Sequence, residues 1–308
     1  MAAESKDNAF KPAYLELESK NKLKTVADKV KNMLVSCRLC PRECSVNRLE
    51  NEIGYCSIGK KAVVSSAFAH RGEERPISGS RGSGTIFFSG CNLKCVFCQN
   101  FSVSHQLQGE KISSSSLARQ MIHLQKINCH NINFVTPSHV IPQLLMALAK
   151  AAKQGLNIPL VYNCGGYEKI ETLELVKNIF DIYMPDFKFW DPQLSEKYLN
   201  APDYPEKVRR AIKWMDNKAG KLKLDEQNIA RRGVLIRHLV MPGAVEDSKK
   251  ILEWIKNELS ENTYVNIMPQ YRPAGKISDC PELQRSLRTE EYRRVQAYAR
   301  KIGLNRLG

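Results

Sequence analysis

The chain has 308 residues, of which 43% are hydrophobic and 26% charged, a composition that is typical of globular proteins and excludes a disordered or fibrous chain. This length accommodates one large α/β unit with extensions, or two smaller domains, and excludes a small module. The 47 lysine and arginine residues exceed the 32 acidic residues by a formal net charge of +15, which would attract an anionic partner. We favour solvated helix faces over a nucleic-acid site, because no nucleic-acid-binding signature accompanies the charge.

No apolar run is long enough to cross a bilayer, since the most apolar helix candidate, Leu144 to Ala152, contains Lys150. The first residues include five acidic side chains and no arginine before Arg38, unlike a secretory signal or a mitochondrial presequence. We therefore expect a cytoplasmic protein without a membrane partner. The acidic residues behind this expectation are Glu4, Asp7, Glu16, Glu18 and Asp28.

The first part of the chain predicts an extension and a cysteine-rich segment. Residues 1–36 are polar, with an apolar stripe from Leu23 to Leu34 that predicts a loosely attached helix. Residues 37–81 are rich in Cys, Arg, Ser and Gly and have too few periodic apolar positions to support their own core. A bound metal would compensate for this, so we interpret 37–81 as a metal-binding segment.

Residues 82–275 alternate between apolar strand patterns and helix patterns, which predicts parallel βα units and an α/β fold. The predicted strands are Thr85–Ser89, Asn131–Val135, Pro159–Asn163, Phe180–Met184, Val234–Val240 and Tyr264–Met268. The predicted helices are Ser113–Ile127, Val140–Gln154, Glu168–Asn178, Glu206–Asp216 and Glu246–Leu259. Residues 276–308 form a C-terminal helical extension with one more helix over Thr289–Ile302.

Four of the ten cysteines fall in the segment 37–81, at a spacing typical of metal coordination in a reducing compartment. Four thiolates complete a closed site, as in structural zinc or in a second [4Fe-4S] cluster, and the spacing does not choose between the two. Unmetallated thiols are the remaining alternative. These four residues are Cys37, Cys40, Cys44 and Cys56, whereas the scattered Cys129, Cys164 and Cys280 are interpreted as small buried hydrophobic residues.

Three further cysteines, Cys91, Cys95 and Cys98, lie directly after the first predicted strand of the 82–275 region. Three thiolates in one loop can hold three irons of a cubane and leave the fourth iron open to a ligand. A zinc site that recruits His105 is the rival hypothesis, which we disfavour because structural zinc requires four protein ligands.

This C-x3-C-x2-C loop, with Phe97 before its last cysteine, resembles the radical S-adenosylmethionine superfamily. The resemblance covers about residues 82–275 and implies a partial (βα)6 barrel. It also implies that Cys91, Cys95 and Cys98 ligate a [4Fe-4S] cluster that binds S-adenosylmethionine, whose reductive cleavage yields a 5′-deoxyadenosyl radical. An electron donor such as flavodoxin or ferredoxin is the implied partner.

Polar residues at the ends of the other predicted strands are candidates for the same site, because parallel strands open their loops on one side. Ser138 or His139 would replace the Gly-Gly-Glu segment that holds the methionine amino group in the superfamily, although His139 with no chemical role is an equal alternative. The glycines after Asn163 permit close approach of a ligand or form only a turn. Gln270 and Tyr271 are placed to face the adenine or a peptide.

Two strings, Met184–Lys188 and Ile236–Gly243, are similar to those of glycyl-radical-enzyme activases of the pyruvate formate-lyase activating type. By that resemblance Asp186 and Lys188 line the cofactor and substrate side, Asn163 with Asp186 holds a cation, and Arg237 contacts the cofactor. A purely structural Asp186–Arg237 ion pair is the alternative. The Cys-Pro-Arg-x-Cys string before the barrel resembles the PflX-like branch of these enzymes.

Three functions follow from these observations, and no catalytic residue is assigned. The leading hypothesis is a radical S-adenosylmethionine oxidoreductase that abstracts hydrogen from an unidentified substrate, such as a residue of a partner protein. The second keeps this chemistry with RNA as the substrate, because of the charge of +15. The third is a non-catalytic adaptor in which both cysteine groups are structural.

Overall fold

A computed structural model describes residues 10–308, so Glu4 and Asp7 lie outside the described residues. Its centre is a ten-stranded sheet in the order β10-β9-β8-β6-β5-β4-β2-β1-β3, with β7 paired to β8. All six predicted strands are present, and neighbours among them pair in parallel. They are β2 (Ser83–Phe88), β4 (Ile132–Val135), β5 (Leu160–Cys164), β6 (Ile182–Pro185), β8 (Ala230–Leu239) and β9 (Tyr264–Met268).

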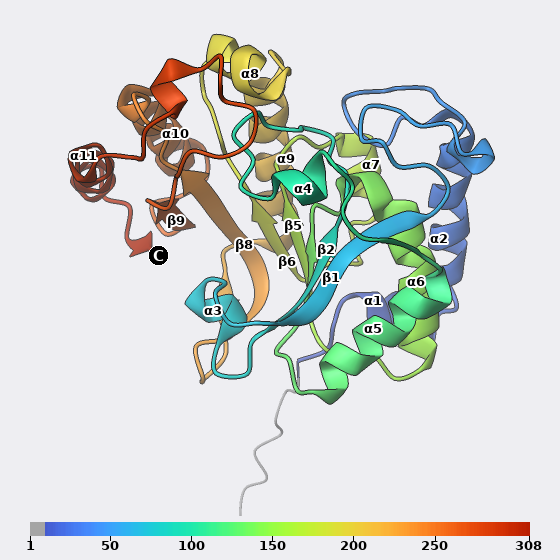
Figure 1. Cartoon of the computed structure of the whole chain (residues 1–308). Coiled ribbons are helices and arrows are strands. Elements are labelled where there is room, and N and C mark those ends of the chain that lie inside the picture. Colours follow the sequence, from blue (N-terminus) through green and yellow to red (C-terminus); the bar gives the residue numbers. More distant parts are fainter. Residues whose placement is uncertain (1–9) are drawn as a thin grey trace, which may run out of the picture.

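Helices connect these strands and flank the sheet, with α5 and α6 on one side and α10 and α11 on the other (Figure 1). The predicted α/β fold with a parallel sheet is confirmed, in keeping with the expected partial barrel. The connecting helices are α5 (Ser114–Lys126), α6 (Ile141–Lys153), α7 (Ile170–Leu175), α8 (Pro192–Leu199), α9 (Tyr204–Ala219), α10 (Val245–Glu258) and α11 (Thr289–Lys301).

The sheet extends beyond the predicted core of 82–275. Strand β1 (Ala62–His70) pairs antiparallel with β2 and with β3 (Glu110–Ile112), so the interpretation of 37–81 as wholly irregular is wrong. Its first residues, Ala62 to Val64, are buried in the main core. At the opposite edge β10 (Arg306–Leu307) pairs in parallel with β9, and the short β7 (Lys223–Leu224) pairs antiparallel with β8.

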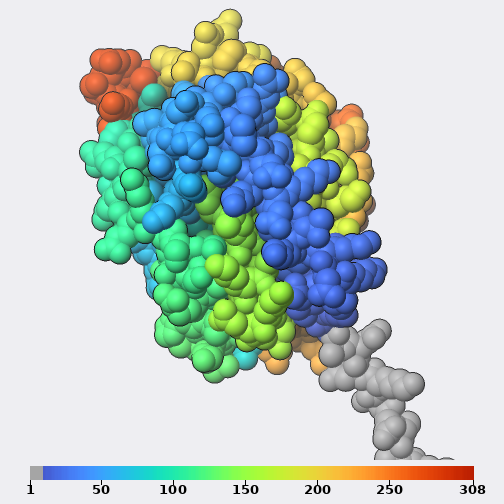
Figure 2. Space-filling view, turned by 90° about the vertical axis from the view of Figure 1, so that its right-hand side faces the viewer, coloured from blue at the N-terminus to red at the C-terminus, as the bar shows by residue number. Residues whose placement is uncertain are grey.

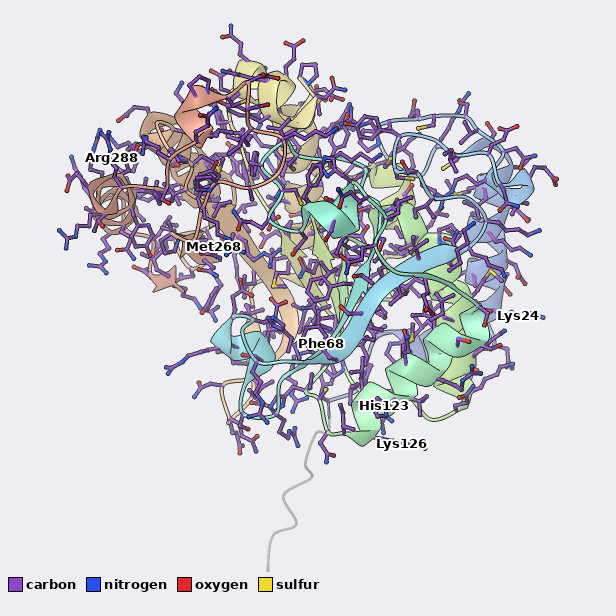
Figure 3. The ribbon with its side chains drawn as sticks, in the orientation of Figure 1. Lys24, Phe68, His123, Lys126, Met268 and Arg288 are labelled. Atoms are coloured by element: carbon purple, nitrogen blue, oxygen red, sulfur yellow. The ribbon has the colours of Figure 1, made fainter. Side chains whose placement is uncertain are left out.

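The N-terminal helix is firmly packed, which corrects the expectation of a loose attachment. Helix α2 (Leu23–Asn32) packs against α6, and its Leu23 and Val30 are fully buried, whereas Lys24 is exposed (Figure 3). A short helix α1 (Tyr14–Ser19) precedes α2, and the 3-10 turn η1 (Met33–Ser36) leads into the cysteines. Figure 2 shows this N-terminal part covering one side of the molecule.

The remaining elements are short. Two single-turn helices, α3 (Arg75–Ser78) and α4 (Phe101–Ser104), and three 3-10 turns, η2 (Arg48–Glu50), η3 (Ser138–Val140) and η4 (Pro281–Leu283), lie in the connections. Cys129, Cys164 and Cys280 are buried as predicted. No helix among residues 10–308 is long and apolar enough to cross a membrane.

Candidate functional site

A cavity of about 300 Å³ lies at the ends of the parallel strands and is lined by residues from six of them or from the loops that follow. It brings together most of the residues that the sequence predicted. These are Cys91, Cys95, Phe97, Cys98, Asn163, Asp186, Lys188, Arg237 and Gln270. Apolar side chains complete the wall, among them Leu239 at the end of β8 and Met268 at the end of β9 (Figure 3). The position agrees with the rule that ligand sites of parallel α/β folds form where strands end.

The loop with Cys91, Cys95 and Cys98 leaves β2 and is held by backbone contacts from two other segments. The Val96 N–H donates to the Tyr198 carbonyl at 3.0 Å, and the Lys276 N–H donates to the Val96 carbonyl at 2.7 Å. Gly275, at φ +78°, lies so close that a Cβ there would stand 2.3 Å from the Val96 oxygen. Only glycine permits this approach and this backbone conformation, so the loop is fixed from the C-terminal side of the sheet.

Phe97 holds the same loop through its ring. The ring is nearly buried and packs edge-on against Phe189 at 5.8 Å, and against Tyr198 and Tyr271 at 6.4 Å each, between ring centroids. Aromatic pairs at such distances stabilise a fixed orientation. Phe97 therefore lines the cavity and anchors the three cysteines at once.

Two of the three sulfur atoms accept hydrogen bonds within the loop. The Leu93 N–H donates to Cys91 Sγ at 3.3 Å, and the Ser104 hydroxyl donates to Cys98 Sγ at 3.1 Å. Burial raises the pKa of Cys91 and Cys95, and the ammonium of Lys188 opposes this effect at both thiols. Donors aimed at sulfur and a nearby cation favour the thiolate form that iron binds.

These three cysteines fit a [4Fe-4S] cluster with one iron free of protein ligands, because they come from one loop and line one cavity at the strand ends. Among residues 10–308, no group of three or more His, Cys, Asp and Glu side chains converges on the position of a single metal ion, so neither cysteine group has the arrangement of a mononuclear zinc site. His105 does not supply a fourth ligand here, since its Nε2 donates to the Lys94 carbonyl and its Nδ1 contacts the Ser104 hydroxyl at 2.8 Å.

Opposite the cysteines, a group of charged side chains is paired internally. The Asp186 carboxylate lies 2.6 Å from Lys188 Nζ and 2.9 Å from Arg237 Nε. Arg237 also donates from Nη2 to Asn163 Oδ1 at 2.7 Å, and its Nη1 lies 3.8 Å from Glu73 Oε2. Burial alone would raise the pKa of Asp186, but Arg237 and Lys188 together hold it below its usual value.

This pairing has two consequences for the sequence predictions. The Asp186–Arg237 ion pair is present, as the structural alternative required. The oxygens of Asn163 and Asp186 both accept from Arg237, so the structure does not leave them free for the cation that the resemblance implied. A guanidinium already occupies the position between them.

Three predicted residues do not line this cavity. His139 is 1% exposed and lines a second cavity instead, because the turn η3 directs it behind the strand end. Ser138 donates to the buried Glu168 carboxylate, and the Tyr271 hydroxyl donates to the Leu283 carbonyl at 2.6 Å. The predictions that Ser138 or His139 holds the methionine amino group and that Tyr271 faces the adenine are not supported by this placement.

Two cavity or network residues were absent from the sequence predictions. Thr136, which lines the cavity after β4, has φ +59°, and nothing in the Thr-Pro dipeptide distinguishes this residue from a simple turn. Glu73 follows β1 and lies beside Arg237, and burial raises its pKa to about 7. It was missed because the strand that positions it was not predicted.

The four N-terminal cysteines line the second cavity, together with Arg48, Tyr55 and His139. Cys37, Cys40 and Cys56 are buried and Cys44 is partly exposed. The structure therefore brings together the four residues that the spacing grouped. It places them beside the Cys91 loop, since the Tyr55 hydroxyl donates to the Leu93 carbonyl at 3.1 Å.

Comparison with known proteins agrees with this geometry. Residues 85–255 match the Radical SAM superfamily. The chain is 34% identical over 298 residues to "Uncharacterized protein MJ0674" of Methanocaldococcus jannaschii, covering 94% of this chain and 82% of that protein.

Among solved structures, the chain is similar to SuiB of Streptococcus suis bound to S-adenosylmethionine, at 11% identity and a TM-score of 0.46, over 69% of this chain and 45% of SuiB. It is also similar to anSMEcpe with bound AdoMet, at 14% identity and a TM-score of 0.45, over 70% of this chain and 58% of that chain. The match thus spans less than two thirds of either solved protein.

Proposed function

The chain belongs to the radical S-adenosylmethionine superfamily, and we propose that the cavity at the strand ends is its active site, with Cys91, Cys95 and Cys98 as the cluster ligands. Membership of the superfamily implies a [4Fe-4S] cluster and S-adenosylmethionine. When bound, the cluster supplies the electron that cleaves the sulfonium, and the 5′-deoxyadenosyl radical so formed abstracts hydrogen from the substrate. One observation supports this proposal above all: three cysteines of one loop face a charged group across one cavity.

The other residues that line the cavity bind the ligand and exclude water. Lys188 and Arg237 offer donors to a ligand that carries a carboxylate, while Asp186 and Asn163 accept from these two side chains and hold them in place. Gln270 and Thr136 offer further polar contacts from the neighbouring loops. Phe97, Leu239 and Met268 exclude water from the reacting centre.

For the substrate we propose a residue of a partner protein, as in the activating enzymes of glycyl-radical enzymes. The support is the similarity of Met184–Lys188 and Ile236–Gly243 to the strings of those activases. A reduced flavodoxin or ferredoxin would then deliver the electron.

The test uses the full chain, purified and reconstituted without oxygen, with S-adenosylmethionine and dithionite. We expect 5′-deoxyadenosine from the wild type and its loss in Cys98→Ala, because removal of one thiolate leaves the cluster with two ligands. Cys129→Ala removes a buried thiol from another part of the core and is the control. Full cleavage activity in Cys98→Ala contradicts the proposed ligand set, and zinc without any 5′-deoxyadenosine in the wild type favours the adaptor.

A further inference from the structure

Arg48, in the N-terminal cysteine-rich segment, is a guanidinium buried without a carboxylate partner. It is 1% exposed and donates to the carbonyl of His139 at 2.8 Å and to that of Gly59 at 3.3 Å. None of the ion pairs within residues 10–308 includes it. Arginine keeps its proton in proteins, and burial of an uncompensated charge costs several kcal/mol. The surroundings of Arg48 therefore require a negative charge that no carboxylate provides.

Sulfur is the remaining source of that charge. Arg48 Nη1 lies 3.6 Å from Cys37 Sγ, and Arg48 lines the same cavity as Cys37, Cys40, Cys44 and Cys56. A second sulfur is also approached by a donor, because the Tyr55 N–H points to Cys44 Sγ at 3.3 Å. Neutral thiols are weak acceptors, whereas thiolates attract both groups.

The cavity wall contains one more polar atom that lacks a partner. His139 is buried, its Nε2 donates to the Ser89 carbonyl at 2.9 Å, and its Nδ1 has no hydrogen-bond partner. With the proton on Nε2, Nδ1 presents a lone pair, and burial keeps the ring neutral by lowering its pKa to about 3. The cavity that the four cysteines line therefore also contains a buried polar atom without a partner.

We propose that Cys37, Cys40, Cys44 and Cys56 bind a second [4Fe-4S] cluster as four thiolates, and that Arg48 is its buried counter-cation. Four thiolates around an oxidised [4Fe-4S] cluster retain a net negative charge, which is the charge that Arg48 requires. This centre is separate from the Cys91 cluster and does not depend on the proposed enzymatic function.

The position of this centre gives it a second role, as a support for the Cys91 loop. A Cβ on Gly90 would stand 2.4 Å from the Cys56 carbonyl oxygen, so the two backbones touch. With standard bond lengths, this contact places the Cα atoms of Cys56 and Cys91 within about 10 Å of each other. The Arg42 Nε donates to the Asn92 carbonyl at 2.8 Å, which ties the first cysteines to the same loop.

The experiment measures iron, sulfide and zinc per chain in full-length protein purified without oxygen. The informative background is Cys98→Ala, which lacks a ligand of the proposed active-site cluster but keeps all four N-terminal cysteines. We expect it to retain about four irons with sulfide. Addition of Cys40→Ala should remove this iron, whereas addition of Cys129→Ala should not. A folded Cys98→Ala protein that holds zinc instead of iron, or no metal after reconstitution, overturns the proposal.

The role of Arg48 is measured as the rate at which chelators remove the N-terminal metal from the same background. In Arg48→Met we expect release about 10- to 100-fold faster, the usual effect of losing a residue that contacts metal ligands. Arg48→Lys keeps the charge and should restore most of the retention. Release from a folded Arg48→Met at the unsubstituted rate refutes the counter-cation. If Arg48→Met does not fold, equal release from Arg48→Lys and Arg48→Gln refutes it instead.

Discussion

Asp186 is the residue on which the charged wall of the active-site cavity depends. Its single carboxylate pairs with both Lys188 and Arg237, and each of these side chains is less than one fifth exposed. Two cations so close together are mutually repulsive, and the carboxylate offsets that repulsion. The wall is therefore preorganised before any ligand binds, and its geometry rests on one acidic group.

We expect Asp186→Asn to lower the free energy of unfolding by about 3 kcal/mol, because it leaves Lys188 without an anion and Arg237 with only the more distant Glu73. Urea denaturation of the unreconstituted protein measures this. The control is Asp279→Asn on the surface, which should change stability by less than about 0.5 kcal/mol. Equal stability of the two variants indicates that a bound ligand, rather than the fold, uses Asp186.

A second buried carboxylate, Glu168, predicts a dependence of stability on pH. It is 2% exposed and accepts from the hydroxyls of Ser138 and Tyr162. Burial raises its pKa from 4.5 to about 7. The folded state therefore binds a proton that the unfolded state releases, so this group's contribution is most favourable below pH 4.5 and declines as pH rises through about 7.

The decline amounts to about 3 kcal/mol. Glu168→Gln removes the titration, so its stability relative to the wild type should rise between pH 5 and pH 8. Urea denaturation of both proteins at the two pH values gives this difference. Parallel stability curves show that Glu168 keeps an ordinary pKa.

At the scale of elements, helix α2 contributes a buried face to the main core. Val30 is fully buried, whereas Val35, five residues later, is 53% exposed. We expect Val30→Ala to lower the free energy of unfolding by about 2 kcal/mol, the transfer free energy of a buried valine side chain. Val35→Ala is the matched control and should be nearly neutral. Equal effects would restore the original expectation of a loosely attached helix.

The sequence predicted the six parallel strands because each is a nearly continuous apolar run between helical patterns. It did not predict β1, whose residues after Val64 are mostly serine and alanine and lie in a cysteine- and arginine-rich stretch. Helix α8 was also missed, although Asp191 caps it and Pro192 opens it, which is a recognisable start signal. Local composition did not indicate β1 or α8, because both elements are stabilised by packing against other parts of the fold.

The same limit applies to the site. Residues directly after predicted strands, such as Asp186 and Gln270, were found because topology alone brings strand ends together. His139 and Tyr271 also follow predicted strands, but their side chains point away from the cavity. The backbone conformation after each strand sets this direction, and the sequence gives no evident signal for it. Glu73 and Arg48 were not predicted, because their partners are distant in sequence.

At the scale of the whole molecule, the charge of +15 is spread over exposed helices, and part of it is paired. Lys213 pairs with Glu258, for example, and Arg294 with Glu246. We expect only non-specific binding of single-stranded RNA, which weakens by about 10³-fold or more between about 50 and 200 mM salt. Fluorescence anisotropy titrations measure this. Sequence-selective binding that survives the higher salt supports RNA as the substrate.

At the contact between Gly90 and Cys56, the two backbones touch with no side chain between them. A shift of the Cys56 carbonyl therefore moves the residue before Cys91 directly. When oxygen disorders one loop, the other loop loses a neighbour that holds it in place. In air, loss of metal from one cysteine group should therefore speed its loss from the other, and each group should be easier to rebuild once the other has been restored.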